Sequence, residues 1–238
     1  MKIVVVVPAY NAGKTIENVF RRTPQEIVQR VDRFIVVNDG SSDSTDSAVE
    51  KLTREYNIEV IRHSKNVGYG AALKSGFKLA LQRGADIIVQ LHADGQYPPE
   101  MISELIRPIE NCTADVSGGS RILYGNMIRQ GMPLYKYIGN IALTTILNVS
   151  LQQKLSSYHS GFRAYSSKAL RIIKFCGLSD YFDFDTQMLI HAVNYGLRIV
   201  EIPIPTSYGD EVSYLNPLKY GFCIIKIAFS ALKSKWQM

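Results

Sequence analysis

The sequence has few cysteines, three in 238 residues. Cys112, Cys176 and Cys223 lie far apart and do not have the spacing of a metal site. We therefore expect reduced thiols in a cytoplasmic protein, since stable disulfides belong to oxidising compartments. A cysteine-based zinc site and a cysteine nucleophile are both disfavoured.

Long apolar runs are also missing. No stretch reaches the roughly 18 uninterrupted apolar residues that a membrane-spanning helix needs. The N-terminus enters directly as a predicted strand, without the basic, apolar and small-residue order of a secretory signal. The balance of 46% apolar and 20% charged residues still suits a globular protein with a sizeable core. We expect one α/β domain over residues 1–214 and an amphipathic helix over residues 215–238.

Acidic residues are absent between Val116 and Ser179, although the same stretch carries eight basic residues. This stretch accounts for the whole positive excess of the chain, whose net charge is +6. An anionic partner is therefore expected there. Nucleic acid is disfavoured, because the stretch lacks a reader motif or a ladder of stacking aromatics. The basic residues are Arg121, Arg129, Lys136, Lys154, Arg163, Lys168, Arg171 and Lys174.

The first half of the chain alternates predicted strands with helical patterns, which indicates a mostly parallel sheet covered on both faces. One helix is predicted over Ala71 to Arg83, with Gly84 as its stop. After Arg121 the alternation fails, and Tyr137 to Gln153 reads as a charge-free helix. The expected strands are Lys2–Pro8, Arg33–Asn38, Glu59–Arg62, Asp86–Leu91 and Asp115–Gly119.

Polar residues follow three of these strands directly. The first strand ends in Pro8, Ala9, Tyr10 and Asn11, and the second is followed by Asn38 to Asp43. The fourth is followed by His92 to Glu100. Strand ends of a parallel sheet share one edge, so these groups are expected to line one crevice. A diphosphate and its metal ion are predicted to bind there.

These motifs resemble the family 2 glycosyltransferases, most closely the dolichyl-phosphate mannosyltransferase branch and its polyprenyl-phosphate relatives. The resemblance covers nearly the whole chain and implies a GT-A fold, which is Rossmann-like. It further implies a nucleotide-sugar site and a motif Ser160-Gly161-Phe162-Arg163. The residues implied for the nucleotide-sugar site are Pro8, Ala9, Tyr10, Asn11, Asp39, Gly40, Ser41, Asn66, Gly68, His92 and Arg121.

The resemblance assigns the metal to Asp94 and Gln96. Asp94 supplies a hard oxygen ligand, and Mg²⁺ or Mn²⁺ is the expected ion. His92 stands where the family commonly has aspartate, so it either binds the donor or favours a softer ion such as Mn²⁺. The alternative for Asp94 is a turn carboxylate that caps the helix near Pro99.

Arg163 is predicted to bind the phosphate of the acceptor or donor, with a plain surface arginine as the alternative. Polyprenyl phosphate is the favoured acceptor, and an inverting reaction is expected. If the acceptor is instead a saccharide hydroxyl, Asp185 is the candidate base. Ser157 and Gln187 replace acidic residues of the family, and residues 208–213 lack an expected basic residue. A nucleotide-sugar binding protein without activity is a further alternative.

The C-terminal stretch repeats apolar residues every three or four positions, and Lys219, Lys226 and Lys233 recur every seven. Two interpretations remain open. The helix either docks on the domain or lies on an anionic membrane surface, which would place the protein at the cytoplasmic face of a membrane. The apolar residues are Leu215, Leu218, Phe222, Ile225, Phe229, Leu232 and Trp236.

Overall fold

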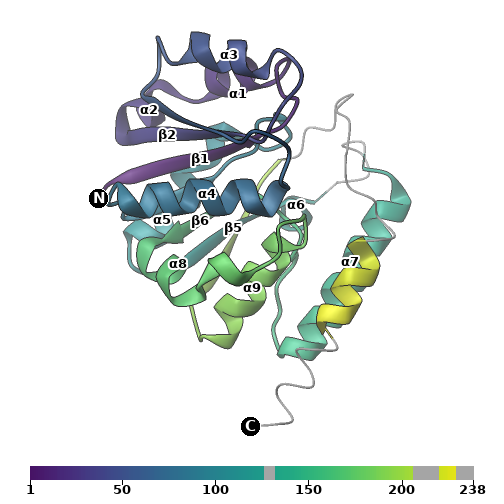
Figure 1. The fold of residues 1–238 in the computed structure, drawn as a ribbon. Helices are drawn as coiled ribbons and strands as arrows, with labels where there is room; N and C mark the ends of the chain where they lie inside the picture. Colours follow the sequence, from purple (N-terminus) through teal and green to yellow (C-terminus); the bar gives the residue numbers. More distant parts are fainter. Residues whose placement is uncertain (126–131, 206–219, 229–238) are drawn as a thin grey trace.

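A seven-stranded sheet forms the centre of the molecule in the computed structural model, which describes residues 1–125, 132–205 and 220–228 (Figure 1). The strand order is β3-β2-β1-β4-β6-β5-β7. Apolar, largely β-branched runs build its central strands, and such runs suit a sheet buried on both faces. The strands are β1 (Ile3–Ala9), β2 (Val31–Asn38), β3 (Ile58–Arg62), β4 (Ile87–Gln90), β5 (Val116–Ser120), β6 (Arg163–Ser166) and β7 (Ile199–Pro203).

The sheet is parallel except at β6, which runs antiparallel to both β4 and β5. Along the chain, β2 pairs with one side of β1 and β3 then pairs with β2. The next strand, β4, pairs with the other side of β1. The carboxyl ends of β1 and β4 therefore flank a topological switch point, which is where open α/β sheets bind ligands. The mostly parallel, two-sided sheet expected from the sequence is confirmed.

The helices of the first half other than α4 cover one face of the sheet. The residues of β1 that point to this face pack with Phe20, Val49 and Leu105 from three different helices. Helix α5 contains Pro108. The turn that follows this helix is closed by the Thr113 and Ala114 amides, which both donate to the Pro108 carbonyl. The elements on this face are α1 (Ile16–Arg22), α2 (Gln25–Arg30), α3 (Thr45–Leu52), the 3₁₀ turn η1 (Pro99–Met101) and α5 (Ile102–Glu110).

The second face carries α4 (Tyr69–Gln82) and the helices of the second half. Gly76 of α4 lies against Val6 of β1, and the lack of a side chain brings this helix close to the sheet. The predicted helix over Ala71 to Arg83 is confirmed, and Gly84 follows it at a φ of +75°. The other elements on this face are α7 (Leu134–Leu151), α8 (Ser167–Ile173), η2 (Phe175–Gly177) and α9 (Phe184–Asn194), while α6 (Arg121–Tyr124) directly follows β5 at the edge of the sheet.

Helix α7 and a helix over residues 220–228 are drawn together at one side of the sheet (Figure 1). Leu147 and Leu151 of α7 belong to the same hydrophobic cluster as Ile224 and Ala228. The described part of the C-terminal helix is thus docked on the domain through its Ile224 side. The rest of the predicted stretch, including Lys219 and Lys233, lies outside the described residues.

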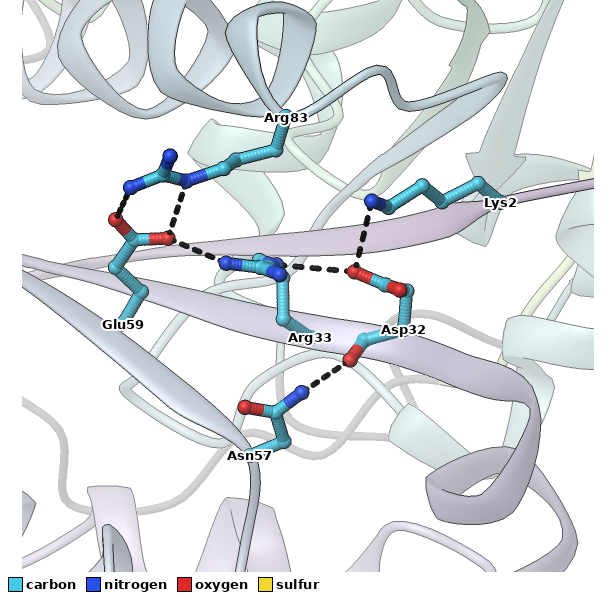
Figure 2. A network of polar contacts seen from close by, with 6 residues as sticks. All are labelled: Lys2, Asp32, Arg33, Asn57, Glu59 and Arg83. Carbon is cyan, nitrogen blue, oxygen red and sulfur yellow. Dashed lines mark hydrogen bonds and ion pairs between the residues drawn. The ribbon is translucent and has the colours of Figure 1, made fainter.

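A polar network joins the amino ends of the strands, at the edge opposite to the predicted crevice (Figure 2). Glu59 at the start of β3 forms ion pairs with Arg33 of β2 and with Arg83 at the end of α4. Asp32 in turn pairs with Arg33 and Lys2. These contacts link three strands and a helix without approaching the polar strand ends.

Candidate functional site

The predicted crevice lies at the carboxyl ends of β1, β2 and β4, which the parallel pairing brings to one edge. Because β6 is antiparallel, its first residue Arg163 pairs with Gln90, the last residue of β4. The start of β6 therefore reaches the same edge as the ends of its neighbours. The sequence motifs after β1, β2 and β4 converge as expected, and the structure adds the motif before β6 to the same edge.

The loops after β1 and β2 are joined by side-chain hydrogen bonds. The Asn11 amide donates to Ser41 Oγ at 3.0 Å, and Asn11 Oδ1 accepts from the Ser42 amide at 3.0 Å. Asn11 adopts a φ of +50°, a conformation that asparagine tolerates better than most residues. Tyr10 beside it is 38% exposed, so a ring is presented at the edge where a nucleoside is predicted.

Asp39 is almost completely buried, and both of its carboxylate oxygens are hydrogen-bonded. Oδ1 lies 2.7 Å from His63 Nδ1 and accepts from the Val67 amide, while Oδ2 accepts from the Gly68 amide at 3.0 Å. The Val67 and Gly68 amides of this loop are therefore bound by Asp39. The residue fixes the loop before α4; direct contact with a nucleoside stays a prediction.

Two glycines of the motifs allow close approach of the backbone. Gly40 has a φ of +66° and lies against the backbone of Lys65, and Gly68 has a φ of +109° and lies against the Asp180 carbonyl. A β-carbon at either position would overlap with backbone atoms. Gly40 thus lets the loops after β2 and β3 meet, and Gly68 lets the loop after β3 meet the segment before α9, while Asn66 is exposed.

Asp94 and His92 stand side by side after β4. Asp94 Oδ2 lies 3.8 Å from His92 Nδ1, and Oδ1 accepts from the Gln96 amide at 3.0 Å. Burial raises the pKa of the Asp94 carboxyl, but His92, the Gln96 amide and Arg121 outweigh this effect and hold it below its usual value. Asp94 is 40% exposed and His92 20%, so both side chains reach the surface of the crevice.

Arg121 follows β5 and lies over the ring of Tyr97, with its guanidinium carbon 4.3 Å from the ring centroid. Cation–π contacts of this kind hold a guanidinium flat against an aromatic face. Because the Arg121 charge also acts on Asp94, the two predicted site residues share one electrostatic environment. Tyr97 in addition accepts a hydrogen bond from the Gly161 amide at 2.8 Å.

A buried hydrogen-bond network lies beneath His92. The Tyr69 hydroxyl is 2.7 Å from His92 Nε2 and donates to Asp185 Oδ2, also at 2.7 Å. Gln90 Nε2 donates both to the Tyr69 hydroxyl and to Asp185 Oδ1. Burial and the Asp185 charge raise the pKa of Tyr69 well above its ordinary value, so its hydroxyl keeps its proton.

Arg163 is fully buried, which excludes the surface arginine considered as its alternative. Its guanidinium donates to the backbone carbonyls of Asp185 and Tyr158. It therefore holds α9 against β6 and places a positive charge beside Asp185. Contact of Arg163 with a phosphate stays a prediction.

The sequence patterns missed three side chains that the structure brings to the site. Tyr69 and Gln90 contact His92 and Asp185, and His63 contacts Asp39. Gln90 is the one polar residue in the apolar β4 strand, a signal that was available in the sequence. His63 follows β3 directly, at the same edge as the other polar strand ends.

Asp94 and His92 suit a divalent ion that is bound partly by the protein and partly by the phosphates of a substrate. Across the ranges that the structure describes, no group of three or more His, Cys, Asp or Glu side chains is placed to hold a metal. Asp94 and His92 provide two donors at the crevice. Ions such as Mg²⁺ are commonly held by one or two side chains plus substrate phosphates, so the residues present fit such a site.

An open, mostly parallel sheet with polar ligands at its switch point places the protein in the GT-A class of fold. The chain belongs to the family 2 glycosyltransferases: the model described as "Glycosyl transferase family 2" matches residues 4–173. It is 33% identical over 221 residues to the UDP-N-acetylglucosamine–dolichyl-phosphate N-acetylglucosaminyltransferase of Methanococcus voltae, covering 87% of this chain and 86% of the relative.

A second relative is the undecaprenyl-phosphate mannosyltransferase of Micrococcus luteus, 30% identical over 242 residues, with 100% of this chain and 97% of the relative covered. Among solved structures, the glucosyl-3-phosphoglycerate synthase of Mycobacterium tuberculosis with Mn²⁺, UDP-glucose and phosphoglyceric acid has a TM-score of 0.74 at 19% identity. The superposition covers 98% of this chain and 80% of the synthase chain. That likeness establishes the fold.

Proposed function

We propose that this glycosyltransferase transfers a sugar from a UDP- or GDP-sugar to the phosphate of a polyprenyl phosphate, with inversion at the anomeric carbon. The observation that carries the proposal is the convergence of Asp94, His92 and Arg121 at the switch point of the sheet. The two named relatives, which act on dolichyl phosphate and undecaprenyl phosphate, support the acceptor.

The donor would lie along the ends of β1, β2 and β4. The predicted nucleoside residues Pro8 to Asn11 and Asp39 to Ser41 belong to loops that hydrogen bonds hold together. Asp94 and His92 would hold the divalent ion, with Gln96 as the third predicted ligand. Such an ion neutralises the negative charge that the nucleoside diphosphate gains as it leaves.

The reaction needs one bond to form and one to break at the anomeric carbon. An oxygen of the acceptor phosphate forms the new bond, and the electron pair of the breaking bond stays with the nucleoside diphosphate. The attacking oxygen is already anionic near neutral pH, so a general base is unnecessary. The surroundings of Asp185 support a reaction without a general base. This candidate base is buried, and both of its carboxylate oxygens already accept hydrogen bonds.

An apolar face on α7 supports a membrane surface as the partner. Several of its described side chains are apolar and exposed: Tyr135 is 64% exposed, Ile138 57% and Val149 72%. Thr145 is exposed as well. Its hydroxyl donates a hydrogen bond to the Ile141 carbonyl of the same helix, so the donor of this hydroxyl is already satisfied. An apolar helical face of this kind suits the boundary between lipid headgroups and acyl chains.

The helix over residues 220–228 adds to this surface. Its Ile224 side is docked, whereas Phe222 is 74% exposed and Ile225 and Lys226 are exposed beside it. No helix in the described part of the chain is long and apolar enough to cross a bilayer. On the strength of these exposed apolar side chains, we propose that a catalytic domain over residues 1–214 and a helix over 215–238 together rest on the cytoplasmic face of a membrane.

The proposal is tested by supplying UDP- and GDP-sugars together with undecaprenyl or dolichyl phosphate in anionic vesicles. The expected product is a glycosyl phospholipid, formed with Mn²⁺ or Mg²⁺. Asp94→Asn should lower kcat by about 100-fold or more, as for loss of a charge partner in the transition state. Transfer to a saccharide hydroxyl in place of the lipid phosphate, or full turnover by Asp94→Asn, would contradict the proposal.

A further inference from the structure

His92 is held from several sides although it lies at the edge of the crevice. Its Nε2 is 2.7 Å from the Tyr69 hydroxyl, and its ring packs edge-to-face on Tyr69 and on Tyr97, with centroid distances of 5.2 and 4.9 Å. The backbone of Gly161 lies against the same ring. The imidazole therefore has one defined orientation, with Nδ1 on the side of Asp94.

The Tyr69 hydroxyl has three polar neighbours and only one proton to donate. Asp185 Oδ2 lies 2.7 Å away and accepts the hydrogen bond from this hydroxyl. The hydroxyl proton is therefore directed to Asp185. Gln90 Nε2 donates to the hydroxyl oxygen at 2.6 Å.

The remaining neighbour of the hydroxyl, His92 Nε2, must then be the donor in its own hydrogen bond. A neutral imidazole has one N–H, so a proton on Nε2 leaves a lone pair on Nδ1. That lone pair and the Asp94 carboxylate face each other at 3.8 Å. The two electron-pair donors are thus placed to bind one cation between them.

We propose that Tyr69, held in place by Gln90 and Asp185, fixes His92 as the Nε2–H tautomer and thereby makes Nδ1 the ligand that shares a divalent ion with Asp94. The inference rests on the proposed function, because that function supplies the ion. Tyr69 itself is a positioning residue that acts through His92. Histidine ligands of metals usually donate their other N–H to such a partner.

The choice of ion follows from the ligand. An imidazole nitrogen suits Mn²⁺ better than Mg²⁺, which prefers oxygen ligands. Removing the Tyr69 hydroxyl should therefore weaken the binding of Mn²⁺ more than the binding of Mg²⁺. A purely structural role of Tyr69 would lower the affinities for both ions alike.

The experiment measures Mn²⁺ binding to the full chain by electron paramagnetic resonance, with UDP and in parallel with GDP. Tyr69→Phe should raise the Kd for Mn²⁺ about 10- to 100-fold. Tyr158→Phe is the matched control, because it also removes a buried tyrosine hydrogen bond, the 3.0 Å contact with Asn148 Oδ1. Tyr158→Phe should bind Mn²⁺ as the wild type does.

A second arm combines Tyr69→Phe with His92→Ala. If Tyr69 acts through His92, the double variant should bind Mn²⁺ no more weakly than His92→Ala alone. Additive losses would overturn the inference, and so would equal Mn²⁺ affinity in the wild type and Tyr69→Phe. If the wild type binds no Mn²⁺ with either nucleotide, the metal-dependent function itself is contradicted and the inference falls with it.

A third experiment determines the tautomer of His92 directly and uses only the wild-type protein. The ¹⁵N shifts of His92 in the metal-free wild type at pH 8 should report a proton on Nε2 and a bare Nδ1. Mn²⁺ is paramagnetic, so Mg²⁺ and Zn²⁺ with UDP serve as diamagnetic probes, and Zn²⁺ should shift the Nδ1 resonance. A proton on Nδ1 of the neutral ring would overturn the assignment.

Discussion

Gly161 lies against His92 so closely that a β-carbon on it would overlap with the ring and come 2.6 Å from Cε1. The same β-carbon would come 2.9 Å from the Tyr69 hydroxyl. The glycine of the Ser-Gly-Phe-Arg motif therefore leaves the space that the His92 ring occupies. Because Tyr69 and Tyr97 hold the ring, it has little freedom to move aside.

Gly161→Ala should displace His92 and lower metal-dependent sugar transfer by at least tenfold, while the chain still folds. The measurement is kcat at saturating donor together with the Kd for Mn²⁺. Gly139→Ala is the control, since a β-carbon on Gly139 meets nothing within 4 Å. Unchanged Mn²⁺ affinity in Gly161→Ala would show that the contact has no bearing on the metal site.

His159 connects the docked C-terminal helix to the domain through a 2.7 Å contact between its Nδ1 and the Tyr220 hydroxyl. Burial of its ring, and next the charge of Arg163, lower the pKa of His159 to about 3. Between the ordinary histidine pKa of about 6.5 and this value, the unfolded chain binds one more proton than the folded chain. His159 therefore makes the free energy of unfolding decrease as the pH falls below about 6.5.

His159→Gln should flatten this dependence by up to about 1.4 kcal/mol per pH unit between pH 6 and pH 5. Urea unfolding across that interval measures it. His191, whose pKa burial also lowers, provides the comparison, and His191→Gln should change the slope less. Equal slopes in wild type and His159→Gln would mean that the imidazole is protonated in the folded protein.

Glu59 joins β3 to β2 and α4 in the network of Figure 2. The hydrogen bond from Arg83, opposed by burial and reinforced by Arg33, lowers the pKa of Glu59 to about 2. Its contribution to stability is complete above the ordinary pKa of about 4.5 and is lost as the pH falls toward 2.

Glu59→Gln should therefore reduce the free energy of unfolding on the order of 1 kcal/mol at pH 7, and by progressively less below pH 4. Added salt at 1 M should shrink the difference, because the pairs are partly exposed. Glu55→Gln removes one exposed negative charge and serves as the control. A deficit that persists unchanged at pH 2 would contradict an electrostatic origin.

Binding to vesicles tests the apolar face of α7. Ile138→Gln combined with Val149→Gln replaces two exposed apolar side chains and preserves the charge of the helix. Loss of their burial in lipid should weaken binding to anionic vesicles by about tenfold or more. The control is Tyr195→Gln, since Tyr195 is 48% exposed and precedes β7, near the amino ends of the strands. Equal sedimentation of wild type and double variant would exclude this face.

The sequence predicted the first five strands to within two residues, because continuous apolar runs followed by polar strand ends are a strong local signal. It missed β6 and β7. Arg163 to Ser166 is only four residues long, and its strand character depends on pairing with β4 and β5 on both sides. Pairing between distant segments leaves little trace in a local pattern.

The candidate site was predictable where motifs follow strands and unpredictable where the contact joins distant segments. Asp94 and His92 were identified from one short segment. The Tyr69–Asp185 contact spans 116 residues and depends on how α4 and α9 pack on the same face of the sheet, so spacing alone did not reveal it. Likewise the burial of Arg163 follows from β6 lying between two strands.

The reversed direction of β6 gives the chain one long excursion away from the sheet. Since β5 ends and β6 begins at the same edge, residues 121–162 leave the sheet and return to it there. The two ends of this excursion meet at the candidate site, where Arg121 lies over Tyr97 and Gly161 lies against His92. An exchange of the excursion with that of a relative is therefore a graft that has to keep both of its ends, and only the residues between them are open to change.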